Sequence, residues 1–147
     1  MEYPAPATPI VCDMTTAPDT GPERMAEYQR LFTQALADRA KTAQGIQFRF
    51  RAAPGIEEWV RDLAVREQAC CPFFISTITP TADQVVWDIT TIDDDAARAL
   101  LAEYYALPDT IALGAAVLHD RYTKLGLQVI GDRPSQNPRT DPATPAQ

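Results

Sequence analysis

The sequence predicts an α/β sandwich in which helices cover one face of a mostly antiparallel sheet. Three observations lead to this class. The segment 46–51 alternates strictly between apolar and polar residues, which is typical of a half-buried strand. Two longer segments, 22–43 and 56–71, repeat apolar residues at helical spacing. Two further apolar runs, 73–79 and 85–89, flank a turn that begins with proline and therefore predict a β-hairpin.

The first elements follow from local signals. Ile10–Met14 is the first predicted strand. A helix is expected from about Pro22 to Ala43, because proline suits a first helical turn and Gly45 ends the pattern. The inward-facing residues of the next strand are Ile46, Phe48 and Phe50.

The second helix is expected from Ile56 to Cys71, because Pro72 disfavours helical geometry at the residue before it. The hairpin follows this helix. A third helix then begins after Asp93, a good N-cap, and its inner face is formed by Ala97, Leu100, Leu101 and Tyr104. We interpret the run Asp93-Asp94-Asp95 as a helix start and not as a cation site. The expected order is β-α-β-α-β-β-α, followed by an added C-terminal helix.

The added helix is predicted to start at Asp109, after Leu107-Pro108, and to end at Gly126. Its apolar residues recur at alternating steps of four and three, at Ile111, Ala115, Leu118, Tyr122 and Leu125. Such a stripe either packs on the chain's own sheet or forms a homodimer through 109–125.

The chain has 147 residues, which suggests one domain. We expect an α/β core at 9–107 and the added helix with a short extension at 108–130. The ends, 1–8 and 131–147, are expected to be disordered; the C-terminal one has almost no apolar side chains to bury.

Composition excludes several functions. The net charge is −7 and no cluster of Lys and Arg is present, which argues against nucleic acid and anionic membranes as partners. No apolar run approaches the roughly 20 residues that span a bilayer, and the N-terminus does not resemble a secretory signal. We therefore expect a cytoplasmic protein with reduced thiols. Three cysteines, two of them adjacent, are a poor disulfide framework and a plausible thiol site.

The sharpest chemical feature is the segment from Glu67 to Phe74, which contains Cys70 and Cys71. Glu67 precedes these cysteines by three and four residues, so all three side chains share one helix face. A carboxylate on an apolar face is costly unless it is paired. Glu67 is therefore expected at the rim, or paired with a base, or acting beside the thiols as proton acceptor or ligand. The candidate bases are Arg24, Arg49, Arg51 or another base nearby.

The cysteines have two interpretations. Buried cysteines often pack as small apolar residues. A helix C-terminus also disfavours a thiolate, so this position does not predict an activated nucleophile. A bound cation reverses that argument, because it deprotonates the thiol. Cys12 supplies a third sulfur, and alternation places it on one face of the first predicted strand together with Ile10 and Met14. Because this strand is expected to join the same sheet as the strand after Cys71, we expect Cys12 within about 7 Å of Cys70 or Cys71.

Three thiolates without histidine suit a soft ion, such as Cu(I), Hg(II) or As(III). His119, the single histidine, lies in the added helix and is assigned a surface or core role, so a zinc site has little support. No resident cofactor is predicted.

The pattern E-Q-x-C-C-P-F-F is similar to that of a family of small, mostly uncharacterised bacterial proteins that occur with heavy-metal, especially mercury, resistance functions. The resemblance covers about Pro9 to Leu107. It implies a β-α-β-α-β-β-α domain with an early strand cysteine. The matching residues are Cys12, Glu67, Cys70, Cys71 and Phe73. The segment from Pro108 onward departs from the family's usual length.

Three functions remain open from sequence. The first is binding of a soft metal by Cys12, Cys70 and Cys71, with Glu67 as a supporting base. The second is an enzyme in which Cys70, Cys71 and Glu67 are catalytic and act on an organometal or an electrophilic small molecule. The third is an interaction module whose cysteines are structural.

Overall fold

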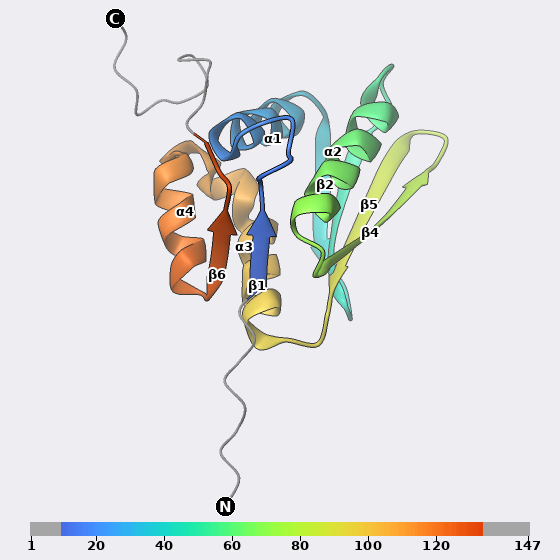
Figure 1. The fold of residues 1–147 in the computed structure, drawn as a ribbon. Coiled ribbons are helices and arrows are strands. Elements are labelled where there is room, and N and C mark those ends of the chain that lie inside the picture. Colours follow the sequence, from blue (N-terminus) through green and yellow to red (C-terminus); the bar gives the residue numbers. More distant parts are fainter. Residues whose placement is uncertain (1–9, 134–147) are drawn as a thin grey trace, which may run out of the picture.

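A computed structural model describes residues 10–133, and this part of the chain forms four α-helices, one short 3₁₀ helix and six strands (Figure 1). Predictions for residues 1–8 and 134–147 lie outside the described residues. The elements are β1 Ile10–Asp13, α1 Gly21–Ala35, β2 Leu36–Lys41, β3 Gly45–Arg51, α2 Ile56–Cys70, β4 Phe74–Pro80, β5 Gln84–Thr91, α3 Asp95–Thr110, η1 Ile111–Leu113, α4 Ala115–Lys124 and β6 Leu127–Ile130.

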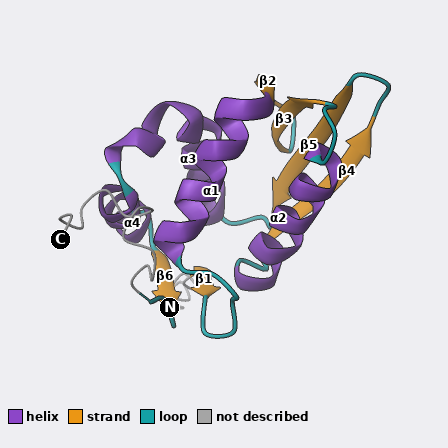
Figure 2. Cartoon of the chain, turned by 90° about the horizontal axis from the view of Figure 1, so that it is seen from above, coloured by secondary structure: helices purple, strands orange, loops and turns teal. Residues whose placement is uncertain are grey.

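The main sheet has four antiparallel strands in the order β2-β3-β5-β4. Phe48 and Trp87 are paired across β3 and β5 and are fully buried on the inner face. Gln47 and Asp88, the next pair, face outward and are joined by a hydrogen bond of 2.9 Å. Figure 2 shows the helices gathered on one side of this sheet. The predicted α/β sandwich is therefore confirmed.

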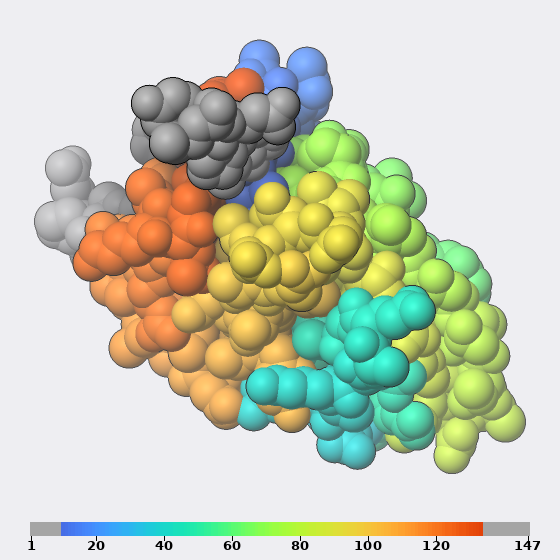
Figure 3. All heavy atoms as spheres, turned by 90° about the horizontal axis from the view of Figure 1, so that it is seen from below, coloured from blue at the N-terminus to red at the C-terminus, as the bar shows by residue number. Residues whose placement is uncertain are grey.

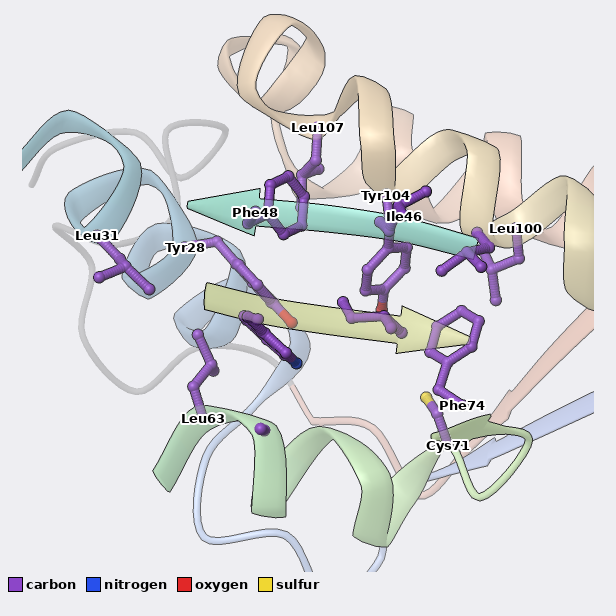
Figure 4. Packing of buried hydrophobic residues seen from close by; sticks show 14 of the residues in the cluster. Tyr28, Leu31, Ile46, Phe48, Leu63, Cys71, Phe74, Leu100, Tyr104 and Leu107 are labelled. Atoms are coloured by element: carbon purple, nitrogen blue, oxygen red, sulfur yellow. The ribbon is translucent and has the colours of Figure 1, made fainter. Parts of the chain in front are cut away.

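The core between this sheet and the helices contains a cluster of aromatic rings (Figure 4). Tyr28 from α1 stacks on Trp87 with ring centroids 6.2 Å apart, and its edge meets Tyr104 from α3 at the same distance. Phe74, at the start of β4, lies 5.1 Å from Tyr104. In Figure 4 the sulfur of Cys71 lies beside Phe74, so the cysteines border the main core.

The first strand does not join the main sheet. β1 pairs in parallel with β6, with Cys12 opposite Val129, and the two strands lie side by side near α4 in Figure 1. We had expected β1 in the same sheet as the strand that follows Cys71, and this was wrong. The reason is β6, a strand that was not predicted because four residues are too short for a clear alternating pattern.

The C-terminal segment begins with contacts to the start of α1. Asp132 Oδ1 accepts a hydrogen bond of 2.8 Å from the Gly21 N–H. The Arg133 side chain donates to the Ala17 carbonyl at 2.7 Å. Residues 131–133, the first of the segment expected to be disordered, are thus hydrogen-bonded to the start of α1 and the loop before it.

The first helix is shorter than predicted. A capping box of Thr20 and Glu23 starts α1, but the helix ends at Ala35 and not near Ala43. Leu36–Lys41 instead forms β2 at the edge of the sheet. This segment has ordinary helix formers, and its pairing with β3 overrides their local preference.

The C-terminal helices also differ from prediction. Asp94, not Asp93, caps α3, accepting a hydrogen bond of 2.8 Å from the Ala97 N–H. Pro108 lies inside α3, so Asp109 belongs to that helix and does not start the next one. Figure 3 shows the surface at the start of α3, in yellow, between the β2–β3 turn and α4.

α4 begins at Ala115 and packs into the chain's own core. Leu118 is 1% exposed and Tyr122 is buried. The stripe proposed for a homodimer is therefore largely covered within one chain. Among residues 10–133, no helix is both long enough and apolar enough to cross a membrane.

Candidate functional site

The C-terminal end of α2 meets β1 at a disulfide. Cys71 caps α2, and its N–H donates to the Glu67 carbonyl at 2.8 Å. Its sulfur is bonded to that of Cys12, and the two Cα atoms are 4.6 Å apart. The predicted closeness of Cys12 to the cysteine pair is thus confirmed. The expectation of three reduced thiols is wrong for this structure, because Cys12 and Cys71 are joined.

The route by which these cysteines meet differs from the one expected. Cys12 and its neighbours Ile10 and Met14 all point inward from β1, as alternation predicted. However, β1 approaches the end of α2 from a separate sheet. The contact therefore joins a strand to a helix end, and not two neighbouring strands.

Cys70 is a free thiol and is 4% exposed. Its sulfur lies 3.6 Å from that of Cys71 and accepts a hydrogen bond of 2.9 Å from Arg24 Nη1. Burial raises the pKa of the Cys70 thiol to about 11, and the negative charge of Glu67 acts in the same direction. Arg24 opposes both effects. Cys70 is therefore protonated at neutral pH.

Arg24 connects the charged groups around this thiol. It is 3% exposed and lies in the first turn of α1. Its guanidinium donates to both oxygens of Asp19, at 3.0 and 2.7 Å, and to Glu67 Oε2 at 3.1 Å. Of the alternatives for Glu67, pairing with a base is confirmed, and the base is Arg24.

The second oxygen of Glu67 accepts a hydrogen bond from the Tyr104 hydroxyl. Burial, with the charge of Glu67 as a further cause, raises the pKa of Tyr104 well above its usual value. Both carboxylate oxygens of Glu67 are thus occupied, and neither has a hydrogen bond to Cys70. The Glu67 carboxylate is linked to the thiol by hydrogen bonds only through Arg24, whereas the Cys70 thiol donates to the Glu67 backbone carbonyl at 3.4 Å.

From the sequence, Arg24 was expected only as a possible partner for Glu67, and Tyr104 only as a core residue. A signal for Arg24 was present, because it lies four residues before Tyr28 on the apolar face of α1. An arginine on that face needs buried partners. Tyr104 carried no such signal, since a tyrosine on an inner helix face is ordinary.

A pocket of about 210 Å³ opens beside the sulfurs, between β1, β6 and helices α1 to α4. Cys12, Cys70 and Cys71 line one end, with Arg24 and Glu67. The other walls are mainly apolar: Met14, Met25, Ala115, Leu118, Leu127 and Val129. His119 also lines this pocket, but within residues 10–133 its side chain forms no hydrogen bond to a sulfur.

In residues 10–133, with Cys12 and Cys71 joined, no three His, Cys, Asp or Glu side chains are arranged to hold a metal ion. The acidic run at the start of α3 is explained locally. Asp94 caps the helix, and Asp93 and Asp95 both pair with Arg98.

Comparisons with protein-family models, curated proteins and solved structures found no match to the chain. The resemblance to the E-Q-x-C-C-P-F-F family stays a prediction.

Proposed function

We propose that the chain binds soft metal ions such as Hg(II), As(III) or Cu(I) through Cys12, Cys70 and Cys71, in cytoplasmic metal resistance or sensing. The convergence of the sulfurs supports this proposal. Cys71 Sγ is bonded to Cys12 Sγ and lies 3.6 Å from Cys70 Sγ. Sulfurs that share one ion at about 2.3 Å lie at most about 4.6 Å apart. Small side-chain rotations would therefore bring the reduced thiols to one ion.

The three-thiolate form requires reduction of the Cys12–Cys71 disulfide. A cellular dithiol would supply two electrons and two protons and leave as its own disulfide. The incoming ion then forms metal–sulfur bonds as S–H bonds break, and the protons pass to solvent. Arg24 stabilises negative charge on Cys70, and Glu67 holds Arg24 in place.

The enzymatic alternative has less support. A nucleophilic cysteine needs a thiolate at neutral pH, whereas the pKa of Cys70 is raised to about 11 and Cys71 is in a disulfide. Glu67, the predicted general base, is occupied by Arg24 and Tyr104. The interaction-module alternative rests on α4, whose stripe is largely buried in its own chain.

Titration of the fully reduced protein with Hg(II) tests the proposal. We expect one equivalent to produce strong ultraviolet ligand-to-metal absorption. The Cys70→Ser, Cys71→Ser double variant should lose most of it, and Cys12→Ser should weaken it. His119→Ala is the matched control, because it changes the same pocket without removing a sulfur. Equal absorption in the double variant and the natural protein would refute the proposal.

A further inference from the structure

The pocket next to the sulfurs is larger and more apolar than a bare ion needs. An ion bound to sulfur occupies only the end formed by the cysteines. The whole pocket, with the cysteine end included, has a volume of about 210 Å³, and its remaining walls are mainly Met, Ala, Leu and Val side chains. For comparison, an apolar cavity of about 150 Å³ binds benzene. This pocket therefore has room for an organic group of about that size.

The state of the cysteines limits what can bind at the sulfur end. With Cys12 and Cys71 joined, Cys70 offers a single thiol to the pocket. A bare soft ion held by one thiolate remains short of ligands. A metal cation that already carries a carbon ligand, of the type R–M⁺, needs only one more. The pocket and the single thiol thus fit the same ligand.

We propose that this pocket binds organometal cations, with the metal bonded to the Cys70 sulfur and a small apolar group between Met25, Leu118 and Val129. The inference rests on the proposed soft-metal function for the choice of sulfur, but it needs no reduction of the disulfide. The metal–sulfur bond forms as the Cys70 S–H bond breaks. The metal's previous anionic ligand leaves, and the proton passes to that anion or to solvent.

Two features distinguish this ligand from other occupants. A carbon electrophile reacts with a thiolate, whereas a soft cation displaces the proton of a buried thiol directly. In addition, Tyr122 lines the pocket, is 6% exposed, and its hydroxyl has no hydrogen-bond partner among residues 10–133. The π face of an aryl group bound in the pocket can accept a hydrogen bond from this hydroxyl, which a methyl group cannot do.

The test uses the full chain without reductant and compares phenylmercury with methylmercury, each in competition with an excess of iodide, which binds these cations but does not reduce a disulfide. We expect one equivalent of either cation to bind at Cys70, and Cys70→Ser to abolish binding. Relative to the competing iodide, the protein should prefer phenylmercury to methylmercury by about tenfold, because only the phenyl group fills the apolar walls.

Pocket variants separate this effect from ordinary thiol reactivity. Ala115→Phe should remove most of the preference for phenylmercury and leave methylmercury binding nearly unchanged. Val117→Phe, on the exposed side of the same helix and outside the pocket, is the control. Val129→Phe replaces Ala115→Phe if circular dichroism shows that the latter misfolds. An unchanged preference in a folded pocket variant would overturn the inference.

Two further outcomes separate the proposals. If the reduced protein binds Hg(II) through its cysteines but the oxidised protein shows no preference for phenylmercury, the soft-metal function stands and the organometal pocket is refuted. If N-phenylmaleimide alkylates Cys70 as fast as a free thiol, the pocket serves carbon electrophiles and the organometal assignment is wrong. If the oxidised protein prefers phenylmercury but the three cysteines of the reduced protein do not bind Hg(II), only the three-thiolate function is refuted.

Discussion

Arg24 is the residue on which the charges around the cysteines depend. It is buried, and it alone bridges Asp19, Glu67 and the Cys70 sulfur. The Glu67 carboxylate would be costly to bury without this partner, whereas Asp19 also pairs with Arg66 at 2.9 Å. The same guanidinium lowers the cost of a thiolate at Cys70, which the helix end and Glu67 would otherwise disfavour. Arg24 therefore links the stability of the fold to the chemistry of the thiol.

Replacing Arg24 with leucine should destabilise the protein strongly. The change leaves Glu67 buried without its charged partner, and such a loss costs about 3–5 kcal/mol. Urea unfolding measures it. Arg61→Leu is the matched control, because Arg61 pairs with Glu57 on the exposed surface of α2 and should contribute only about 0.5 kcal/mol. Similar losses in the two variants would contradict the assigned role of Arg24.

The raised pKa of Cys70 should appear as a loss of stability at alkaline pH. The unfolded thiol ionises near its usual pKa of 9.0, whereas the folded thiol holds its proton to about 11. Below pH 9, the difference between these two pKa values stabilises the folded protein by roughly 2–3 kcal/mol. This stabilisation disappears as the pH rises from 9 to 11. Urea unfolding across this range, compared with Cys70→Ala, isolates it from the tyrosines. Parallel pH profiles for the two proteins would refute it.

Removing the charge of Glu67 should lower the pKa of the Cys70 thiol. In Glu67→Gln the pKa of Cys70 should fall, because a negative charge near the thiol is lost while Arg24 remains. Thiolate absorbance during a pH titration reports this pKa. An unchanged or higher pKa in this variant would show that Glu67 does not act on the thiol.

Among the elements, α2 and the strands β3, β4 and β5 were predictable, whereas β2, β6 and the bounds of the other helices were not. Ile46, Phe48 and Phe50 are all buried, as strict alternation indicated. The segment 36–41 carries no such pattern, and only its pairing with β3 makes it a strand. β6 is four residues long and exists because β1 supplies its hydrogen bonds. Local sequence does not encode pairing between such distant segments.

The disulfide ties β1 to the end of α2 and should stabilise the fold. It closes a loop with a sequence separation of 59, for which chain entropy predicts about 4 kcal/mol, with native disulfides typically giving 2–5. Adding dithiothreitol should therefore lower the free energy of unfolding by about this much. Unfolding curves with and without reductant measure it.

Cys12→Ala is the control for that measurement, since it lacks the bond and should not respond to reductant. Mass spectrometry after alkylation should count one reactive thiol in the unfolded, non-reduced protein and three after reduction. Three thiols without reductant would show that the bond does not form in solution.

Across the whole molecule, the site joins distant parts of the chain. The E-Q-x-C-C-P-F-F segment marked one end of it, and the alternation around Cys12 marked another. The contributions of Arg24, Tyr104 and Val129 come from α1, α3 and β6, whose positions depend on the complete fold. A local pattern identifies the reactive side chains, but the walls of the pocket follow only from tertiary packing.

The C-terminal region completes both the pocket and the core, and this can be tested with one helix. Leu118→Asp should unfold the protein, because Leu118 is 1% exposed and a buried, unpaired carboxylate costs several kcal/mol. Val117→Asp, at an exposed neighbouring position, should leave the fold unchanged. Circular dichroism and sedimentation distinguish the outcomes. If Leu118→Asp instead gave a folded monomer from a natural dimer, residues 109–125 would form an interface between two copies, as the sequence alone also allowed.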